Sequence, residues 1–285
     1  MGTALIGLAL AMILFLLAAG VTIIFGVLGV INFAHAAYFT LGAFIAFLAS
    51  STLGSFWLAF PIALVVAGAI GALQEVLTFR PIYNHPHSLQ LIASLGFSTL
   101  ILAAIHFIWG IDYRNIPTPA LFSGSIAFMG SELSSYRLFV IALGLAACFL
   151  LNWAIEHTRW GILIKAASSN SNMLACLGIN VRRLRTVVLA AGSAVAALAG
   201  VVVAPLLAVQ LDMGGSMLLD SFLVVVLAGL GSVKGAIVVS LILGMSAAFG
   251  QRFFPDWIQF ATYSLALAFL MVRPSGLFGR KVRVA

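Results

Sequence analysis

GVLGVINFAHAAYFTLG, residues Gly26 to Gly42, decides the fold because it interrupts a long apolar run with glycines and two polar side chains. No Asp, Glu, Lys or Arg precedes Glu75, so Asn32 and His35 stand in sequence that otherwise reads as membrane-buried. A helix that breaks inside a membrane leaves backbone groups that must find partners in protein or water. The stretch therefore predicts two apolar helices joined by a break around residues 29–36.

The composition of the whole chain is that of a polytopic membrane protein. Of its 285 residues, 63% are hydrophobic and only 7% are charged, and the mean hydropathy is +1.20. Apolar runs of the roughly 20 residues that a bilayer-spanning helix needs recur along the chain without the alternation of a β-barrel. We predict an all-α polytopic membrane protein with about eight to nine transmembrane or re-entrant helices. The expected segments are 3–28, 35–51, 56–78, 89–109, 137–155, 187–209, 217–231, 235–250 and 257–272.

The distribution of charge predicts orientation and argues against nucleic-acid binding. The net charge of +7 is concentrated in short segments between apolar runs, as membrane orientation requires. Segment 156–186 contains five basic residues against the single acid Glu156, and the C-terminal tail is also basic, so both are expected on the cytoplasmic side. Loop 110–136 is expected outside.

Cys148 lies in an apolar run and Cys176 in a basic loop, so they are not expected to form a disulfide.

The number of membrane crossings predicts a second break. A single helix over residues 217–250 would put the C-terminal tail on the wrong side, whereas a break at GLGSVKG, Gly229 to Gly235, restores the parity and places the N-terminus outside. Paired Gly-broken hairpins in the two halves of a chain are typical of a substrate pathway at a repeat interface. The candidate pathway residues are Gly29, Asn32, His35, Gly231 and Ser232. The alternative is that Asn32 and His35 only cap a kink or hydrogen-bond a neighbouring helix.

The segment RWGILIKAASSNSNMLACLGINVRRLR, Arg159 to Arg185, is too polar to span a membrane. Residues 165–177 contain neither Pro nor Gly and place apolar residues at helical spacing, and Gly178 follows as a plausible C-terminal cap. This pattern predicts a short amphipathic helix on the cytoplasmic face. Such a helix could lie on the lipid surface or dock into a groove on a soluble partner.

These motifs together carry a resemblance to a known family. The first break, the loop GILIKAASSNSNMLACLGIN, the stretch AGLGSVKGAIVVSLILG and the closing RPSGLFG resemble permease subunits of branched-chain amino-acid ABC importers of the LivH type. The similarity runs from about residue 5 to 280 with similar order and spacing. It implies one permease domain over residues 1–285, with a cytoplasmic coupling loop at 156–186, in a bacterial cytoplasmic (inner) membrane.

The resemblance also implies partners and coupling residues. The loop would insert into a groove on an ATPase subunit, with Gly161, Lys165, Ala166, Asn170, Ala175 and Gly178 belonging to the coupling element. It implies two ABC ATPases, a second homologous permease and an extracytoplasmic solute-binding protein. The family pattern often has an acidic residue where this loop reads SSNSN, so the resemblance predicts that a charged contact to the ATPase is absent or replaced here.

Other classes of protein fit the sequence less well. No G-x-x-x-x-G-K-[ST] loop is present, so ATP would be hydrolysed by another chain, and no histidine or acid spacing predicts a metal site or other cofactor. Lys234 is expected to snorkel or to cap a helix end. The alternative is a secondary transporter or channel for small polar solutes such as urea or amides. Ion-driven carriers usually keep an ionisable group at membrane depth. The acidic residues here fall at or beyond the ends of the apolar segments, and Asp220 is the nearest exception.

Overall fold

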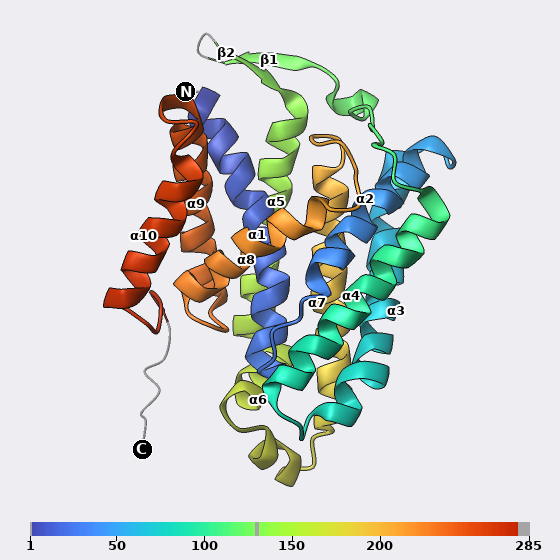
Figure 1. Ribbon diagram of the computed structural model, residues 1–285, viewed down its shortest axis with the longest axis vertical. Coiled ribbons are helices and arrows are strands. Elements are labelled where there is room, and N and C mark those ends of the chain that lie inside the picture. The colour runs from blue at the N-terminus through green and yellow to red at the C-terminus, as the bar shows by residue number, and fades with distance from the viewer. Residues whose placement is uncertain (1, 129–130, 279–285) are drawn as a thin grey trace.

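The computed structural model describes residues 2–128 and 131–278 as a bundle of tilted helices (Figure 1). Its α-helices are α1 (Gly2–Leu28), α2 (His35–Ser51), α3 (Ala59–Gln74), α4 (His87–Trp109), α5 (Ser135–His157), α6 (Arg159–Cys176), α7 (Val181–Val203), α8 (Met213–Ala228), α9 (Val233–Phe253) and α10 (Ile258–Val272). All nine predicted apolar segments correspond to helices, and α6 is the predicted helix of the polar loop. The all-α polytopic class is confirmed.

Short elements join several of these helices. A 3₁₀ turn, Phe56–Leu58, precedes α3, and a π-helical turn, Glu75–Phe79, and a second 3₁₀ turn, Arg80–Ile82, follow it. A third 3₁₀ turn, Ala120–Phe122, leads into an antiparallel hairpin of β1 (Ser125–Phe128) and β2 (Ser131–Ser134), in which Ser125 pairs with Ser134. This hairpin lies in the loop between α4 and α5 and is not predicted by the sequence pattern.

The helices differ in length, and α1 is the central one. Within the described residues, six helices are long and apolar enough to cross a membrane, whereas α2, α8 and α10 are shorter. At 1.5 Å per residue, the 16-residue α8 is about 24 Å long, less than the hydrocarbon thickness of about 30 Å, and it runs obliquely across the molecule (Figure 1). The helix α1 lies at the centre and packs on α5, α7, α8 and α9.

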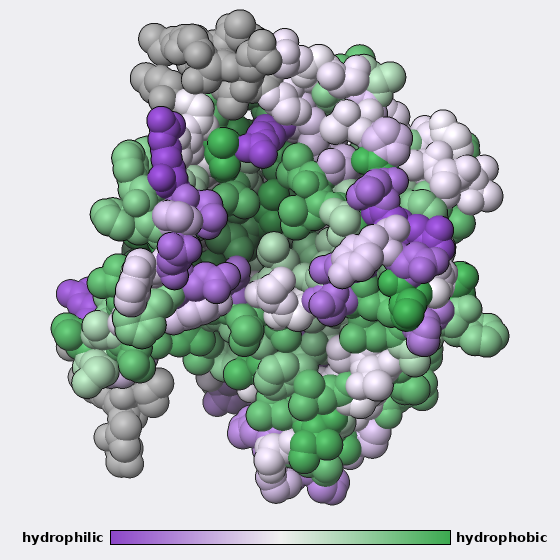
Figure 2. Space-filling model, turned by 45° about the horizontal axis from the view of Figure 1, so that its top comes forward, coloured by the Kyte–Doolittle hydropathy of each residue, from purple (hydrophilic) through white to green (hydrophobic). Residues whose placement is uncertain are grey.

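Opposite ends of the bundle carry different connections. The turn after α3 and the helix α6 lie at one end, and the loop that contains β1 and β2 lies at the other (Figure 1). The view in Figure 2 shows a hollow with a largely hydrophobic floor between the side formed by α9 and α10 and the side formed by α2 and α4. Hydrophilic residues gather on both rims of this hollow.

Both predicted breaks are present, and they meet. The chain leaves helical geometry over residues 29–34 and again over residues 229–232. Gly29 (φ +68°), Gly229 (φ +93°) and Gly231 (φ +85°) adopt left-handed backbone conformations that other residues rarely adopt. A Cβ placed on Gly231 would lie 3.4 Å from the Cα of Gly26 at the end of α1. The two Gly-broken hairpins therefore share one location.

Candidate functional site

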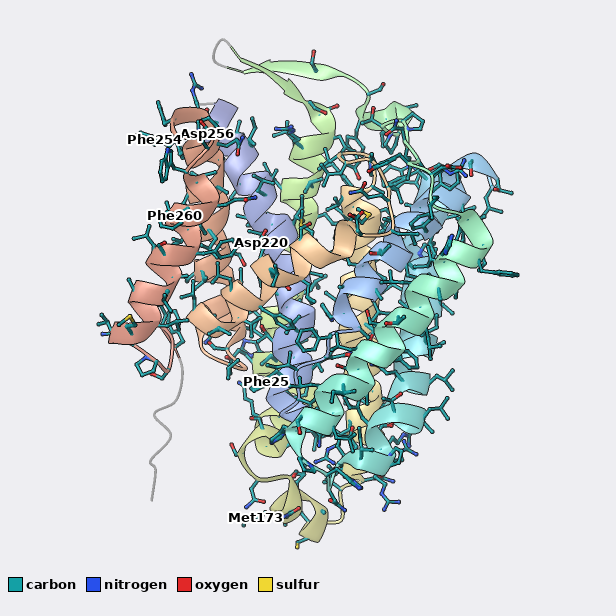
Figure 3. All side chains as sticks on the ribbon, viewed as in Figure 1. Phe25, Met173, Asp220, Phe254, Asp256 and Phe260 are labelled. Carbon is teal, nitrogen blue, oxygen red and sulfur yellow. The ribbon has the colours of Figure 1, made fainter. Side chains whose placement is uncertain are left out.

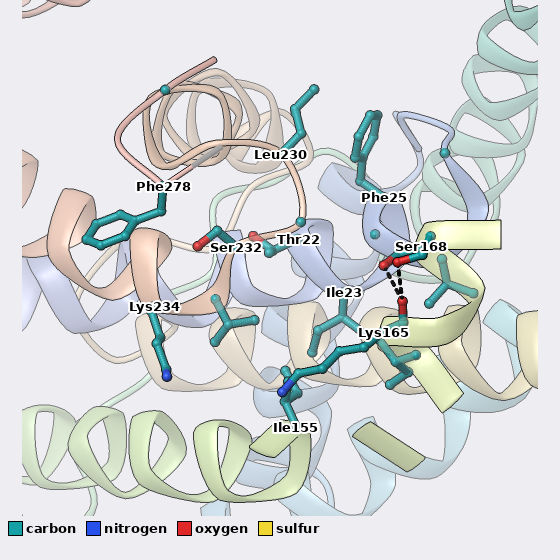
Figure 4. A pocket seen from close by; sticks show the side chains of 18 of the residues that line it. Thr22, Ile23, Phe25, Ile155, Lys165, Ser168, Leu230, Ser232, Lys234 and Phe278 are labelled. Carbon is teal, nitrogen blue, oxygen red and sulfur yellow. Dashed lines mark hydrogen bonds between the residues drawn. The ribbon is translucent and has the colours of Figure 1, made fainter. Parts of the chain in front are cut away.

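A cavity of about 1750 Å³ lies where the two breaks meet, toward the α6 end of the bundle. It is open on one side and bordered by α1, α5, α6, the α8–α9 break and the segment that follows α10 (Figure 4). Ile23, Phe25 and Leu230 supply apolar surface, and Ser168 and Ser232 supply hydroxyl groups. Among the predicted pathway residues, Gly29, Gly231 and Ser232 line this cavity.

Asn32 lies in the first break but is buried away from the cavity. Its amide exchanges two hydrogen bonds with Gln74 of α3, at 3.1 Å and 3.0 Å, and its Oδ1 also accepts from the Ala34 N–H at 3.1 Å. The hydroxyl of Tyr38 donates to the same Gln74 oxygen at 3.1 Å. The Phe33 N–H donates to the Ser94 hydroxyl at 3.2 Å. The backbone freed by the break is thus held by the Ser94 side chain of α4 and by the Asn32 side chain, which Gln74 of α3 fixes in place.

His35, the first residue of α2, is fully buried against α1. Its Nε2 lies 3.0 Å from the carbonyl oxygen of Leu17, so this nitrogen carries the proton and donates. A Cβ at Gly20 would lie 2.6 Å from the imidazole Cε1, so only a glycine at position 20 leaves room for the ring. The side chain therefore joins α2 to α1 here, and its role in a pathway stays a prediction.

The second break is closed by its own cap and by the end of the chain. Ser232 accepts a hydrogen bond from the Gly235 N–H at 3.1 Å and so caps α9. The N–H groups of Leu277 and Phe278 donate to the carbonyls of Leu227 and Ala228, at 2.8 Å and 3.0 Å. The last carbonyls of a helix have no partners within that helix. The RPSGLFG motif supplies N–H donors to two of these carbonyls in α8.

The polar loop folds as a bent helix that begins earlier than the sequence pattern indicated. Thr158 caps α6 by accepting from the Gly161 N–H at 3.2 Å. At Asn170 the backbone becomes extended (φ −158°, ψ 96°), and the Asn170 Oδ1 accepts from the Met173 N–H at 2.9 Å, which starts a second short helical piece. Gly178 ends it with φ +81°, as predicted.

The predicted coupling residues divide between the two pieces of α6. Gly161 is buried against the backbone of Ile155, and Ala166 is half-buried. Lys165 and Asn170 line the cavity. Ala175 and Gly178 are exposed at the tip, beside the exposed apolar side chains of Met173 and Leu177. Figure 3 places Met173 at the extremity of the bundle. The tip therefore presents small and apolar side chains that are free to contact another molecule.

One carboxylate connects three elements at the rim of the cavity. Glu156, near the end of α5, accepts from the Lys165 ammonium of α6 at 2.6 Å and lies 3.1 Å from the Lys234 ammonium of α9. Figure 4 shows both lysine side chains directed toward α5. All three residues line the cavity. The Lys234 ammonium, which the sequence predicts to snorkel or to cap a helix end, has this carboxylate as a defined partner.

Comparison with known proteins identifies the family. Residues 3–272 match the model of the family described as "Branched-chain amino acid transport system / permease component". The chain belongs to this family. It is 28% identical to the high-affinity branched-chain amino acid transport system permease protein LivH of Salmonella typhimurium, over 93% of this chain and 91% of that protein. It is 29% identical to the corresponding permease protein BraD of Pseudomonas aeruginosa, again over 93% and 91% of the two chains.

A solved structure shares the fold of this permease. The structure of "PsaBC from Streptococcus pneumoniae in complex with Fab" aligns with a TM-score of 0.50 at 16% identity, over 98% of this chain and 92% of that one. Membership of the permease family confirms the resemblance seen in the sequence motifs and disfavours a secondary transporter or channel. The relatives are transport permease proteins rather than enzymes.

Two polar side chains at this site, Gln74 and Glu156, have partners that the sequence pattern does not predict. Gln74, the partner of Asn32, is not singled out by the sequence pattern. Glu156 was noted as the single acid of a basic segment, but not as the shared partner of two lysines. A lone acid among five basic residues was the available signal for Glu156, because a carboxylate in such a segment has several possible cationic partners.

Proposed function

We propose that this permease is one half of the membrane channel of an ATP-driven importer for branched-chain or related amino acids. A second homologous permease would form the other half, two ABC ATPases would dock on the α6 side, and an extracytoplasmic binding protein would deliver the solute. The α6 end and the C-terminus would face the cytoplasm of a bacterial cell whose inner membrane holds the complex.

The observation that carries this proposal is that one cavity touches both helix breaks and α6. A solute pathway in a membrane is built where helices are interrupted, because unwound backbone and helix ends offer polar groups to the solute. The apolar wall of Ile23, Phe25 and Leu230 suits the side chain of a branched amino acid, and the N-terminus of α9 at Ser232 suits a carboxylate. Gly29, Gly231 and Ser232 are the proposed pathway residues at this inner mouth, and Asn32 and His35 would hold the first break open beside it.

The exposed tip of α6 supports the proposed ATPase contact. Small residues at Ala175 and Gly178 let a groove close around the helix, while Met173 and Leu177 offer apolar surface to bury. Arg182, which lines a surface hollow together with Ala175, fits a partner groove that carries acidic side chains, because the SSNSN stretch supplies no acidic residue of its own.

Reconstitution in lipid vesicles tests the proposal. The permease alone should give no concentrative leucine uptake, whereas the complete set of second permease, ATPases and loaded binding protein should give ATP-dependent uptake. Ala175→Trp should abolish that uptake because the indole blocks the groove; Leu145→Trp, at an exposed position on α5, is the matched control. Concentrative uptake by the permease without ATPases, or unchanged uptake by Ala175→Trp, would contradict the proposal.

A further inference from the structure

We infer that Glu156 is a positioning residue that transmits movement of α6 to the α8–α9 break. This inference rests on the proposed function and names the side chains through which the ATPase contact would reach the cavity. Lys165 belongs to α6, and Lys234 belongs to the first turn of α9, directly after the break. The Glu156 carboxylate holds one lysine on each of its two oxygens.

The geometry joins two elements that share α1 as a neighbour but otherwise pack mainly on different helices. The helix α6 packs on α1, α5 and α7, whereas α9 packs mainly on α1, α8 and α10. Their lysines reach the same carboxylate across the rim of the cavity, so a displacement of Lys165 changes the environment of Lys234 at once. Gly229 and Gly231 lie in the break just before α9 and have positive φ, and Lys234 lies in the first turn, where backbone N–H groups have no partner within the helix.

The exposure of the three side chains fits a contact that forms and breaks. The side chains of Glu156, Lys165 and Lys234 are 32%, 46% and 64% exposed. Ion pairs with this much water around them contribute little to folding stability. They can therefore open and close during a transport cycle, and substitutions that remove them should leave a folded permease.

The charge arrangement is also specific rather than a general excess of cations. Arg183, at the start of the neighbouring α7, is exposed and forms no ion pair with any residue that the structure describes. Removing its charge changes the net charge of this face by the same amount as removing that of Lys234. Arg183→Gln is therefore the matched control for Lys234→Gln.

The experiment measures leucine imported per ATP hydrolysed in vesicles that contain the complete transporter. Glu156→Gln, Lys165→Gln and Lys234→Gln should each lower this ratio about five-fold or more, the range of typical coupling between sites. Any two of these changes combined should lower it no further than one, because each breaks the same link. Arg183→Gln should keep the wild-type ratio. Co-purification of the ATPases should be unchanged throughout, which separates the link from assembly.

Reversal of all three charges gives the decisive test. The variant Glu156→Lys, Lys165→Glu, Lys234→Glu restores two opposite-charge pairs and should recover the ratio to within about two-fold of wild type. Failure to recover would mean that the lysines act on another molecule, and the link would be rejected. Wild-type behaviour of Glu156→Gln in an ATP-dependent transporter would reject the link alone, whereas uptake by the wild-type permease without ATPases would reject the proposed function as well.

Discussion

Individual polar residues in this permease are satisfied by partners that lie far away in the sequence. Asn32 stands out in the sequence as a polar residue in an apolar run, but its partner Gln74 is 42 positions away. Apolar periodicity gives the helix on which a residue lies, but it does not say which helices are neighbours. The sequence therefore predicted that Asn32 had a special role, and left open whether the role was in the pathway or in holding the break.

A double-mutant cycle on Asn32 and Gln74 separates these two roles. Asn32→Ala and Gln74→Ala should each destabilise the permease by about 1–3 kcal/mol, because each leaves a buried amide without its partner. The double variant should lose less than the sum, since the second change removes the orphaned group. Thermal unfolding in detergent measures the cycle, with exposed Asn172→Ala on α6 as the control.

The result also bears on transport. Strict additivity in the cycle would contradict the reciprocal hydrogen bonds seen here. Loss of leucine uptake by Asn32→Ala without any loss of stability would assign Asn32 to the pathway. A loss of stability with a proportionate loss of uptake would assign it to holding the break.

At the scale of elements, the sequence predicted where helices break better than where they end. Glycines with positive φ at 29, 229 and 231 mark the breaks, because this conformation is costly for other residues. In contrast, α7 begins six residues before the predicted position 187, because the Asn180 side chain accepts from the Arg183 N–H and caps it. A cap of this kind depends on a rotamer, which the apolar pattern does not contain.

The attachment of the C-terminal segment to α8 was also beyond the sequence pattern. Gly276 has φ +76°, and a Cβ there would lie 2.5 Å from the Gly229 nitrogen. Gly54 has φ +68° with no atom near a Cβ. The first glycine therefore serves both conformation and close approach, whereas the second serves conformation alone.

This difference gives a test of the segment as a cap. Gly276→Ala should cost about 1–3 kcal/mol more than Gly54→Ala, because it adds the loss of the hydrogen bonds to the Leu227 and Ala228 carbonyls to the same backbone strain. The measurement is the unfolding midpoint of each variant in detergent. Equal midpoints would show that the segment contributes nothing to holding α8.

At the scale of the whole molecule, hydropathy does not distinguish central from peripheral helices. The most apolar windows of α7 and α5 have similar hydropathies of 2.3 and 2.4, yet 67% of the first and 22% of the second is buried. Lipid tails are as apolar as a protein interior, so a membrane helix needs the same composition in either place. For this reason the apolar helices could be located from the sequence, but the central position of α1 could not be predicted.

Orientation in the membrane is the remaining property of the whole molecule that the charge pattern predicts. The α6 end carries Arg159, Lys165, Arg182 and Arg183, and the opposite end carries the α4–α5 loop. Basic residues close to apolar spans remain in the cytoplasm. Cys176 on α6 is exposed, whereas Cys148 is buried. The native protein therefore has one accessible thiol at the end that should be inside the cell.

A membrane-impermeant thiol reagent reads this orientation directly. In intact cells that express the permease alone, Cys176 should stay unlabelled, and in inside-out vesicles it should react; Cys176→Ser should remove the signal. Ser123→Cys in that background, at an exposed site in the α4–α5 loop, should show the reverse pattern. Labelling of Cys176 in intact cells would place α6 outside, where no ATPase could reach it. When ATPases are co-expressed, slower labelling of Cys176 in inside-out vesicles is expected, because the proposed groove would cover the residue adjacent to Ala175.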